Sequence, residues 1–212
     1  MQRRDFSRSL MTAGALASAS LALPSAWAQR IGFKEGTDYL RLAKPVEVAA
    51  PAGQIEVVEF FAYSCIHCYR FEPLLETWIA KVPADVKVRR SPVAFSPAFQ
   101  PMQRLYFTLE AMGLVDKLHA KVFHAFHEEN LKLVTQQAIA DWVEKHGVDR
   151  KQFLAFFNDN AVKLAAEATK LQDAYLVEGT PALGIAGRFY VGGQGPKTLV
   201  IADSLIDQVR KG

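Results

Sequence analysis

The sequence predicts an α/β fold in which a helical region is inserted between the two halves of a strand-containing domain. Three observations lead to this prediction. Residues 55–61 form an apolar, β-branched and aromatic run, and helical and alternating patterns follow it. Residues 97–176 show helical periodicity almost throughout. Two short strand patterns and a last helical pattern follow at residues 181–211.

The first half of the domain is expected to begin with a buried strand at residues 55–61. A mixed lead-in precedes it at residues 29–53. Only two charged residues, Glu56 and Glu59, interrupt the apolar run of this strand. Glu56 is expected at the surface, whereas Glu59 is considered again below.

A helix and a second strand complete this half. Residues 65–81 carry apolar side chains at helical spacing and predict a helix. A kink is expected at Pro73, because proline removes a backbone hydrogen-bond donor. Residues 86–95 alternate between apolar and polar side chains and predict the second strand.

The inserted region, at about residues 97–176, is expected to contain several helices. Residues that commonly end helices interrupt its pattern. These expected breaks are Gly113, the region of Asn130, Gly147 and residues 158–160. Four histidines of this region are expected on the surfaces of its helices. They are His119, His124, His127 and His146.

The second half of the domain is expected at the C-terminal end. Residues 181–185 and 188–191 predict two strands of a hairpin, joined by the tight turn Ala186-Gly187. Residues 198–211 predict the closing helix. A strand–helix–strand unit followed by a hairpin and a helix is the plan of the thioredoxin fold. We therefore expect residues 29–212 to form one thioredoxin-like domain that carries the helical insertion.

Residues 1–28 have the features of an export signal. A basic start with Arg3, Arg4 and Arg8 precedes an uncharged stretch, and Ala26-Trp27-Ala28 offers small residues where a signal peptidase cleaves. The paired arginines fit a twin-arginine signal, and a Sec signal stays open as well. The sequence therefore predicts export to an oxidising compartment.

Composition narrows the possible functions. The chain has 212 residues, of which 50% are hydrophobic and 22% charged, as in ordinary globular proteins. Its formal net charge of +3 includes no long run of Lys and Arg, so we expect no nucleic-acid partner. A monomer is expected.

The only two cysteines, Cys65 and Cys68, lie at the start of the first predicted helix. A disulfide between them closes almost no loop and contributes little stability, so the pair is expected to serve chemistry. Unpaired backbone N–H groups and the helix dipole favour a thiolate at Cys65, which predicts Cys65 as the nucleophile. Cys68 lies one turn deeper and is predicted to resolve the mixed disulfide. His67 lies between them and is predicted to stabilise the thiolate.

A zinc site is the main alternative for this motif. A Cys-x-x-Cys pair forms half of many zinc sites, and two distant histidines are enough to complete one. No second Cys-x-x-Cys pair exists in the chain. Export and the position between a strand and a helix favour redox chemistry, so we expect neither a metal nor a cofactor.

Two segments resemble the DsbA family of bacterial periplasmic disulfide oxidases. The run 57–61 leads into Cys65-Ile66-His67-Cys68, which is similar to the family's Cys-Pro-His-Cys motif with Ile66 in place of proline. Gly179-Thr180-Pro181-Ala182 is similar to the family's cis-proline loop, which often has Val where Thr180 stands. The helical insertion is also a family feature.

The resemblance implies roles for three further residues. The Thr180–Pro181 bond is expected to be cis, with the backbone of Thr180 facing Cys65 and ready to pair with a substrate strand. Glu59 is expected to be a buried acid that relays protons to the resolving cysteine. Arg90 and Arg89 on the next strand are equally placed to pair with it.

The resemblance also implies the function. We expect an enzyme that donates a disulfide to newly exported, unfolded proteins that contain cysteine, and that a quinone-linked DsbB-like membrane protein reoxidises. A reductase or an isomerase would share the same motif and differ in redox equilibrium. Isomerases of this fold usually carry a separate dimerisation domain, for which the lead-in leaves no room.

Overall fold

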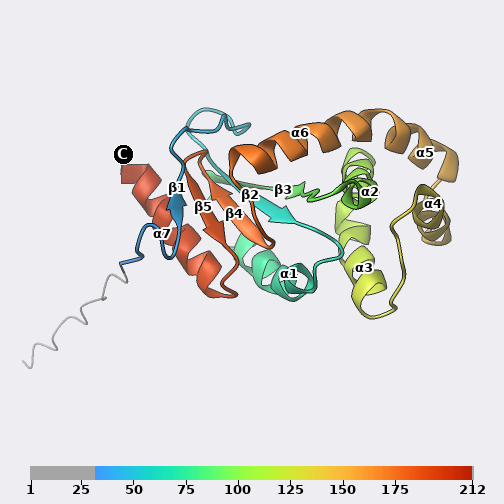
Figure 1. Cartoon of the computed structure of the whole chain (residues 1–212), viewed down its shortest axis with the longest axis horizontal. Coiled ribbons are helices and arrows are strands. Elements are labelled where there is room, and N and C mark those ends of the chain that lie inside the picture. The colour runs from blue at the N-terminus through green and yellow to red at the C-terminus, as the bar shows by residue number, and fades with distance from the viewer. Residues whose placement is uncertain (1–31, 212) are drawn as a thin grey trace, which may run out of the picture. The chain divides into compact units, whose positions relative to one another are not determined.

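The computed structural model describes residues 32–211. Within this range the chain forms a five-stranded mixed sheet in the order β1-β5-β4-β2-β3 (Figure 1). The predicted export signal, with its cleavage site at residues 26–28, lies outside the described residues. Among those that are described, no helix has the length and apolar character needed to cross a membrane.

The central strand is β2 (Ile55–Phe61), and all seven of its residues are buried. It pairs in parallel with β3 (Val86–Pro92) and antiparallel with β4 (Ala182–Ile185). β4 continues through a hairpin into β5 (Phe189–Gly192). These four strands confirm the predicted ones to within three residues at each end.

The edge strand β1 (Leu40–Arg41) was not predicted. Its two residues are too few to show a periodic pattern, and they become a strand only by pairing with β5. The hairpin turn, in contrast, was predicted. Ala186 and Gly187 have φ angles of 52° and 66°, as in the type I′ turns that join twisted antiparallel strands.

Helices α1 (Ile66–Ile79) and α7 (Lys197–Lys211) pack on one face of the sheet. Their apolar residues meet Val57 of β2 and the inward side chains of β4 and β5. α1 continues through Pro73 without a break. The other face of the sheet carries Val58 and Phe60, which pack against Tyr175 just after α6.

The inserted region contains the remaining helices. They are the short 3-10 helix η1 (Pro97–Phe99), α2 (Gln100–Ala111), α3 (Val115–His127), α4 (Gln136–Lys145), α5 (Arg150–Asn158) and α6 (Asn160–Ala174). All four predicted breaks are confirmed. Gly113, Asn130 and Gly147 have positive φ angles between consecutive helices, and Asp159 separates α5 from α6.

The end of β2 lies where the insertion meets the sheet. Phe61, Tyr63 and Cys68 belong to the same buried cluster as the apolar faces of α2 to α6. The redox motif therefore sits between the two parts of the fold, with contacts to both.

Two expectations about exposure were wrong. Glu56 is only 2% exposed, because β2 is covered on both faces and offers no outward position. Its carboxylate accepts hydrogen bonds from Arg89 Nε at 3.0 Å and from the N–H of Ala49 at 2.9 Å. His119 is 4% exposed, because α3 turns it towards the sheet rather than to solvent.

The other three histidines differ among themselves. His124 is exposed, as expected, whereas His127 and His146 are half-buried. Sequence periodicity identified the helices that carry these residues, but it did not identify which side of each helix faces the rest of the protein.

Candidate active site

Cys65 is the N-cap residue of α1, one position before the first helical residue. Its N–H donates to the carbonyl of Ala62 at 3.0 Å, which turns the chain from the end of β2 into the helix. Its Sγ accepts a hydrogen bond from the N–H of Cys68 at 3.3 Å. An N-cap side chain that accepts from the first turn satisfies a backbone donor that the helix leaves free. In this protein the accepting N-cap atom is the sulfur of Cys65.

The two thiols have opposite environments. They are not bonded to each other, so this geometry describes the dithiol form. The pKa of Cys65 is lowered to about 5, above all by a hydrogen bond from the Cys68 side chain, although burial opposes the change. The Thr180 side chain and the N–H groups of Cys68 and His67 lower it further. Burial raises the pKa of Cys68, whose side chain is fully enclosed. Cys65 is therefore the thiolate and Cys68 the thiol.

The loop before β4 faces Cys65. The Thr180–Pro181 peptide bond is cis, which confirms the prediction. The Sγ of Cys65 lies 3.4 Å from the carbonyl oxygen of Thr180, within hydrogen-bond distance of a thiol donor. Gly193, after β5, supports this loop from behind. A Cβ atom at Gly193 would lie only 2.7 Å from the carbonyl oxygen of Pro181.

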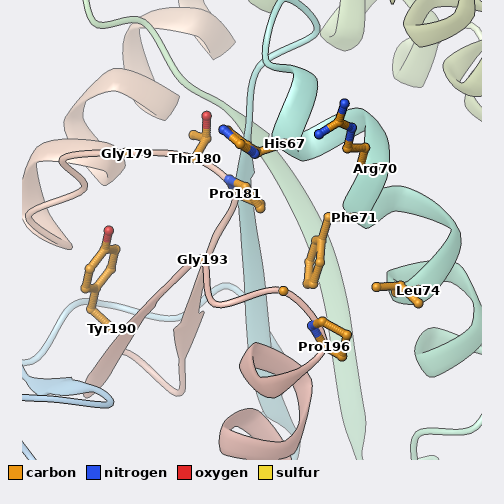
Figure 2. A pocket seen from close by; sticks show the side chains of 11 residues that line it. His67, Arg70, Phe71, Leu74, Gly179, Thr180, Pro181, Tyr190, Gly193 and Pro196 are labelled. Atoms are coloured by element: carbon orange, nitrogen blue, oxygen red, sulfur yellow. The ribbon is translucent and has the colours of Figure 1, made fainter.

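A groove of about 490 Å³ extends from this loop (Figure 2). Its walls come from α1, from the cis-proline loop and from the segment after β5. Its lining on α1 combines the basic side chains of His67 and Arg70 with the apolar side chains of Phe71 and Leu74. In the described part of the chain, no hydrogen bond joins the imidazole of His67 to the sulfur of Cys65. The backbone N–H of His67 is among the groups that lower the pKa of Cys65.

Glu59 lies on the face of β2 that α1 covers and is 0% exposed, and Arg90 joins it to Glu72 of α1. Burial, reinforced by the charge of Glu72, raises its pKa to about 8, while Arg90 acts in the opposite direction. Arg90 Nε donates to Glu59 Oε2 at 3.0 Å, so Arg90 rather than Arg89 is its partner. Strand parity explains this choice, because adjacent residues of β3 point to opposite faces of the sheet. Arg89 therefore pairs with Glu56 on the other face.

The buried charges extend beyond the pair that the sequence suggested. Arg90 Nη2 also donates to Glu72 at 2.7 Å and to Glu76, both on α1. His119 Nε2 lies 3.4 Å from Glu72 Oε1, and burial lowers the pKa of His119. The sequence analysis missed Glu72, although a signal was present. Glu72 occupies a position of the apolar stripe of α1, between Phe71 and Leu75.

The zinc alternative requires further ligands beside the two cysteines. Within residues 32–211, no group of three or more His, Cys, Asp and Glu side chains is arranged to hold a metal ion. The histidines nearest to the motif make other contacts. His119 Nδ1 lies 2.8 Å from the hydroxyl of Tyr63, and His127 Nε2 lies 2.8 Å from the carbonyl oxygen of Tyr63.

Comparisons with known proteins agree with the geometry. A family model described as the DSBA-like thioredoxin domain matches residues 56–202. The chain is 38% identical over 217 aligned residues to the thiol:disulfide interchange protein DsbA of Bordetella parapertussis, covering 100% of both proteins. It is 41% identical to DsbA of Pseudomonas aeruginosa, with 96% of this chain and 97% of that protein covered.

Solved structures show the same relationship. The crystal structure of Pseudomonas aeruginosa DsbA superposes with a TM-score of 0.80 at 40% identity, covering 84% of this chain and 95% of that one. The oxidoreductase DsbA from Xylella fastidiosa gives a TM-score of 0.79 at 30% identity, covering 84% of this chain and 98% of that one. With its Cys-x-x-Cys helix cap, cis-proline loop and helical insertion, this chain belongs to the family of DSBA-like thioredoxin domains and is a thiol:disulfide oxidoreductase.

Proposed function

We propose that this protein donates the disulfide between Cys65 and Cys68 to cysteine-containing proteins newly exported to the periplasm. One observation carries the proposal. The thiolate of Cys65 is stabilised at the N-cap of α1, where the N–H of Cys68 reaches its sulfur. That stabilisation exists only when the disulfide is open, so it favours the reduced protein and makes the oxidised protein an electron acceptor. Disulfide oxidases of the DsbA family are the familiar example of this principle, and the direction follows here from the chain's own contacts.

The reaction has two exchange steps. A substrate thiolate attacks the Sγ of Cys65 in the oxidised protein, the bond between Cys65 and Cys68 breaks, and Cys68 leaves as a thiolate that takes up a proton. A second substrate thiolate then attacks the substrate sulfur of the mixed disulfide, and Cys65 leaves. The substrate loses two electrons and gains a disulfide, while the pair becomes a dithiol. The low pKa of Cys65 makes it a good leaving group in the second step.

Glu59 supplies the proton that Cys68 requires. The raised pKa of Glu59, about 8, keeps its carboxyl group protonated over much of the neutral range. Its position on the buried face beneath α1 supports a relay to the resolving cysteine. His67 stabilises the Cys65 thiolate through its backbone N–H.

The cis-proline loop and the groove receive the substrate. Once a mixed disulfide has formed, the Thr180 backbone is available to pair with an extended substrate segment, as in other cases of strand addition. The apolar lining of the groove, with Phe71 and Leu74, suits side chains that are exposed only in unfolded proteins.

The remaining parts of the proposal come from the sequence and, for the membrane partner, from the family. Residues 1–28 act as the export signal, and residues 29–212 act as one monomeric domain. A quinone-linked membrane protein of the DsbB type reoxidises the dithiol.

The redox equilibrium of the purified protein with glutathione tests the proposal. We expect Cys65 and Cys68 to be reduced at a ratio of reduced to oxidised glutathione that leaves an ordinary structural disulfide intact. Denaturant unfolding of the two redox forms is the second measurement, and the reduced form should be more stable. If the oxidised form is clearly the more stable one, the reductase interpretation replaces this proposal.

A further inference from the structure

The last residue of α3, His127, contacts both ends of the redox motif. Its Nε2 lies 2.8 Å from the carbonyl oxygen of Tyr63, two residues before Cys65. A carbonyl oxygen only accepts hydrogen bonds, so Nε2 carries the proton and donates. The imidazole ring also stacks on Tyr69, the residue directly after Cys68, with 5.1 Å between ring centroids and 16° between planes. One side chain of the insertion thus spans the motif.

A second histidine of α3 holds the same loop. His119 lies two turns before His127, and its Nδ1 is 2.8 Å from the hydroxyl of Tyr63. The side chain of Tyr63 is almost fully buried among Phe61, Phe123 and the ring of His119. Main chain and side chain of Tyr63 are therefore both attached to α3.

The position of this loop determines the position of the Cys65 sulfur. The loop from Tyr63 to Cys65 joins the end of β2 to the start of α1. As a thiolate, the sulfur accepts a hydrogen bond from the N–H of Cys68 at 3.3 Å. A small displacement of the loop would lengthen this contact, and hydrogen bonds weaken steeply as their geometry departs from the optimum.

We propose that His127 is a positioning residue for the Cys65–Cys68 pair, through which the helical insertion holds the redox motif. It is not a catalytic residue, because it touches neither sulfur directly. Its hydrogen bond to Tyr63 and its stacking on Tyr69 keep the loop and the first turn of α1 in register. The inference rests on the proposed function, since it concerns the thiolate on which disulfide donation depends.

Three variants separate positioning from simple packing. His127→Ala removes the hydrogen bond and the stacking. His127→Gln keeps an N–H group that can reach the carbonyl of Tyr63. Tyr69→Leu leaves His127 and its hydrogen bond in place and removes the stacking, together with the contacts of Tyr69 with Phe123 and Glu128. The control is His124→Ala, which changes an exposed histidine of the same helix that pairs with Glu129 at the surface.

The readouts are the pKa of Cys65, followed by the ultraviolet absorbance of its thiolate, and the rate of disulfide transfer to a reduced unfolded protein. In His127→Ala we expect the pKa of Cys65 to rise and the rate to fall about fivefold, the equivalent of one lost hydrogen bond. His127→Gln should restore most of both, Tyr69→Leu should have a smaller effect than His127→Ala, and the control should equal the wild type. Unfolding of both redox forms is measured alongside.

Two outcomes would overturn the inference. One is a His127→Ala protein that loses equal stability in both redox forms while the pKa of Cys65 and the transfer rate stay unchanged. The other is a folded His127→Gln protein in which the pKa of Cys65 and the transfer rate depart from the wild type as far as expected for His127→Ala. This outcome decides the question even if the alanine variant fails to fold. A wild-type Cys65 with the pKa of an ordinary thiol is a different result, and it would overturn the proposed function and this inference together.

Discussion

The Sγ of Cys65 lies 3.4 Å from the carbonyl oxygen of Thr180, although 115 positions separate the two residues in the chain. Cys65 follows β2 and Thr180 precedes β4, and these two strands are antiparallel neighbours in the sheet. The end of β2 and the start of β4 therefore lie side by side at the same end of the sheet. The sheet brings together the nucleophile and the loop that faces it, while the helical insertion lies between them in sequence.

The two cysteines should differ when each is replaced by serine. In Cys68→Ser the mixed disulfide cannot be resolved by the chain, so covalent complexes with exported proteins should accumulate. In Cys65→Ser the remaining thiol is fully enclosed and has a raised pKa, so no complexes should form. Non-reducing electrophoresis of cells that express each variant measures this. Complexes with Cys65→Ser but not with Cys68→Ser would reverse the assigned roles.

The reduced form should gain stability over the oxidised form as pH rises. The pKa of Cys65 falls from 9.0 to about 5 in the folded protein, so folding favours loss of its proton. A lowered pKa contributes stability that is fully present above about pH 9 and is lost as pH falls through about 5. We expect the difference between the unfolding free energies of the two forms to increase between these limits. Cys65→Ser forms no disulfide and lacks this thiol, so its stability should not show the rise with pH that the reduced wild type shows. A difference between the two wild-type forms that stays flat with pH would contradict the prediction.

The contribution of Glu59 to folding stability should change with pH in the opposite direction, and it should do so in both redox forms. Its pKa rises from 4.5 to about 8, so the folded protein holds the proton more tightly than the unfolded chain. This contribution is fully present below about pH 4.5 and is lost as pH rises through about 8. Glu59→Gln should remove this loss of stability. The slope of unfolding free energy against pH should then be smaller by up to about 1.4 kcal/mol per pH unit. Unfolding of the oxidised form across this range is the measurement, and parallel curves for variant and wild type would contradict it.

Gly193→Ala should displace the cis-proline loop. A Cβ atom there would lie 2.7 Å from the carbonyl oxygen of Pro181, a main-chain atom that cannot turn aside as a flexible side chain can. We expect a loss of about 1–3 kcal/mol in stability and at least about a tenfold loss in transfer rate. The matched control is Gly192→Ala, where the nearest atom to a new Cβ is 3.8 Å away. Equal rates for the two variants would show that the loop tolerates the displacement.

The sequence by itself determined the order of the elements and the chemistry of the motif. The strands β2 and β3, the breaks at Gly113 and Gly147 and the turn at Ala186-Gly187 follow from local patterns and local conformational preferences. The spacing of Cys65 and Cys68 is itself a local feature, so the redox motif was visible without a structure.

Only the tertiary structure decided which polar side chains are buried and with whom they pair. Glu56 is buried because both faces of β2 are covered, its own carboxylate by Ala49 of the lead-in and Arg89 of β3. Glu72 joins Glu59 because both approach Arg90 from different elements. The contacts of His119 and His127 with Tyr63 join residues 56 and 64 positions apart. Periodicity shows that a helix has an apolar face, but the partner of that face depends on packing between distant segments, which no local pattern records.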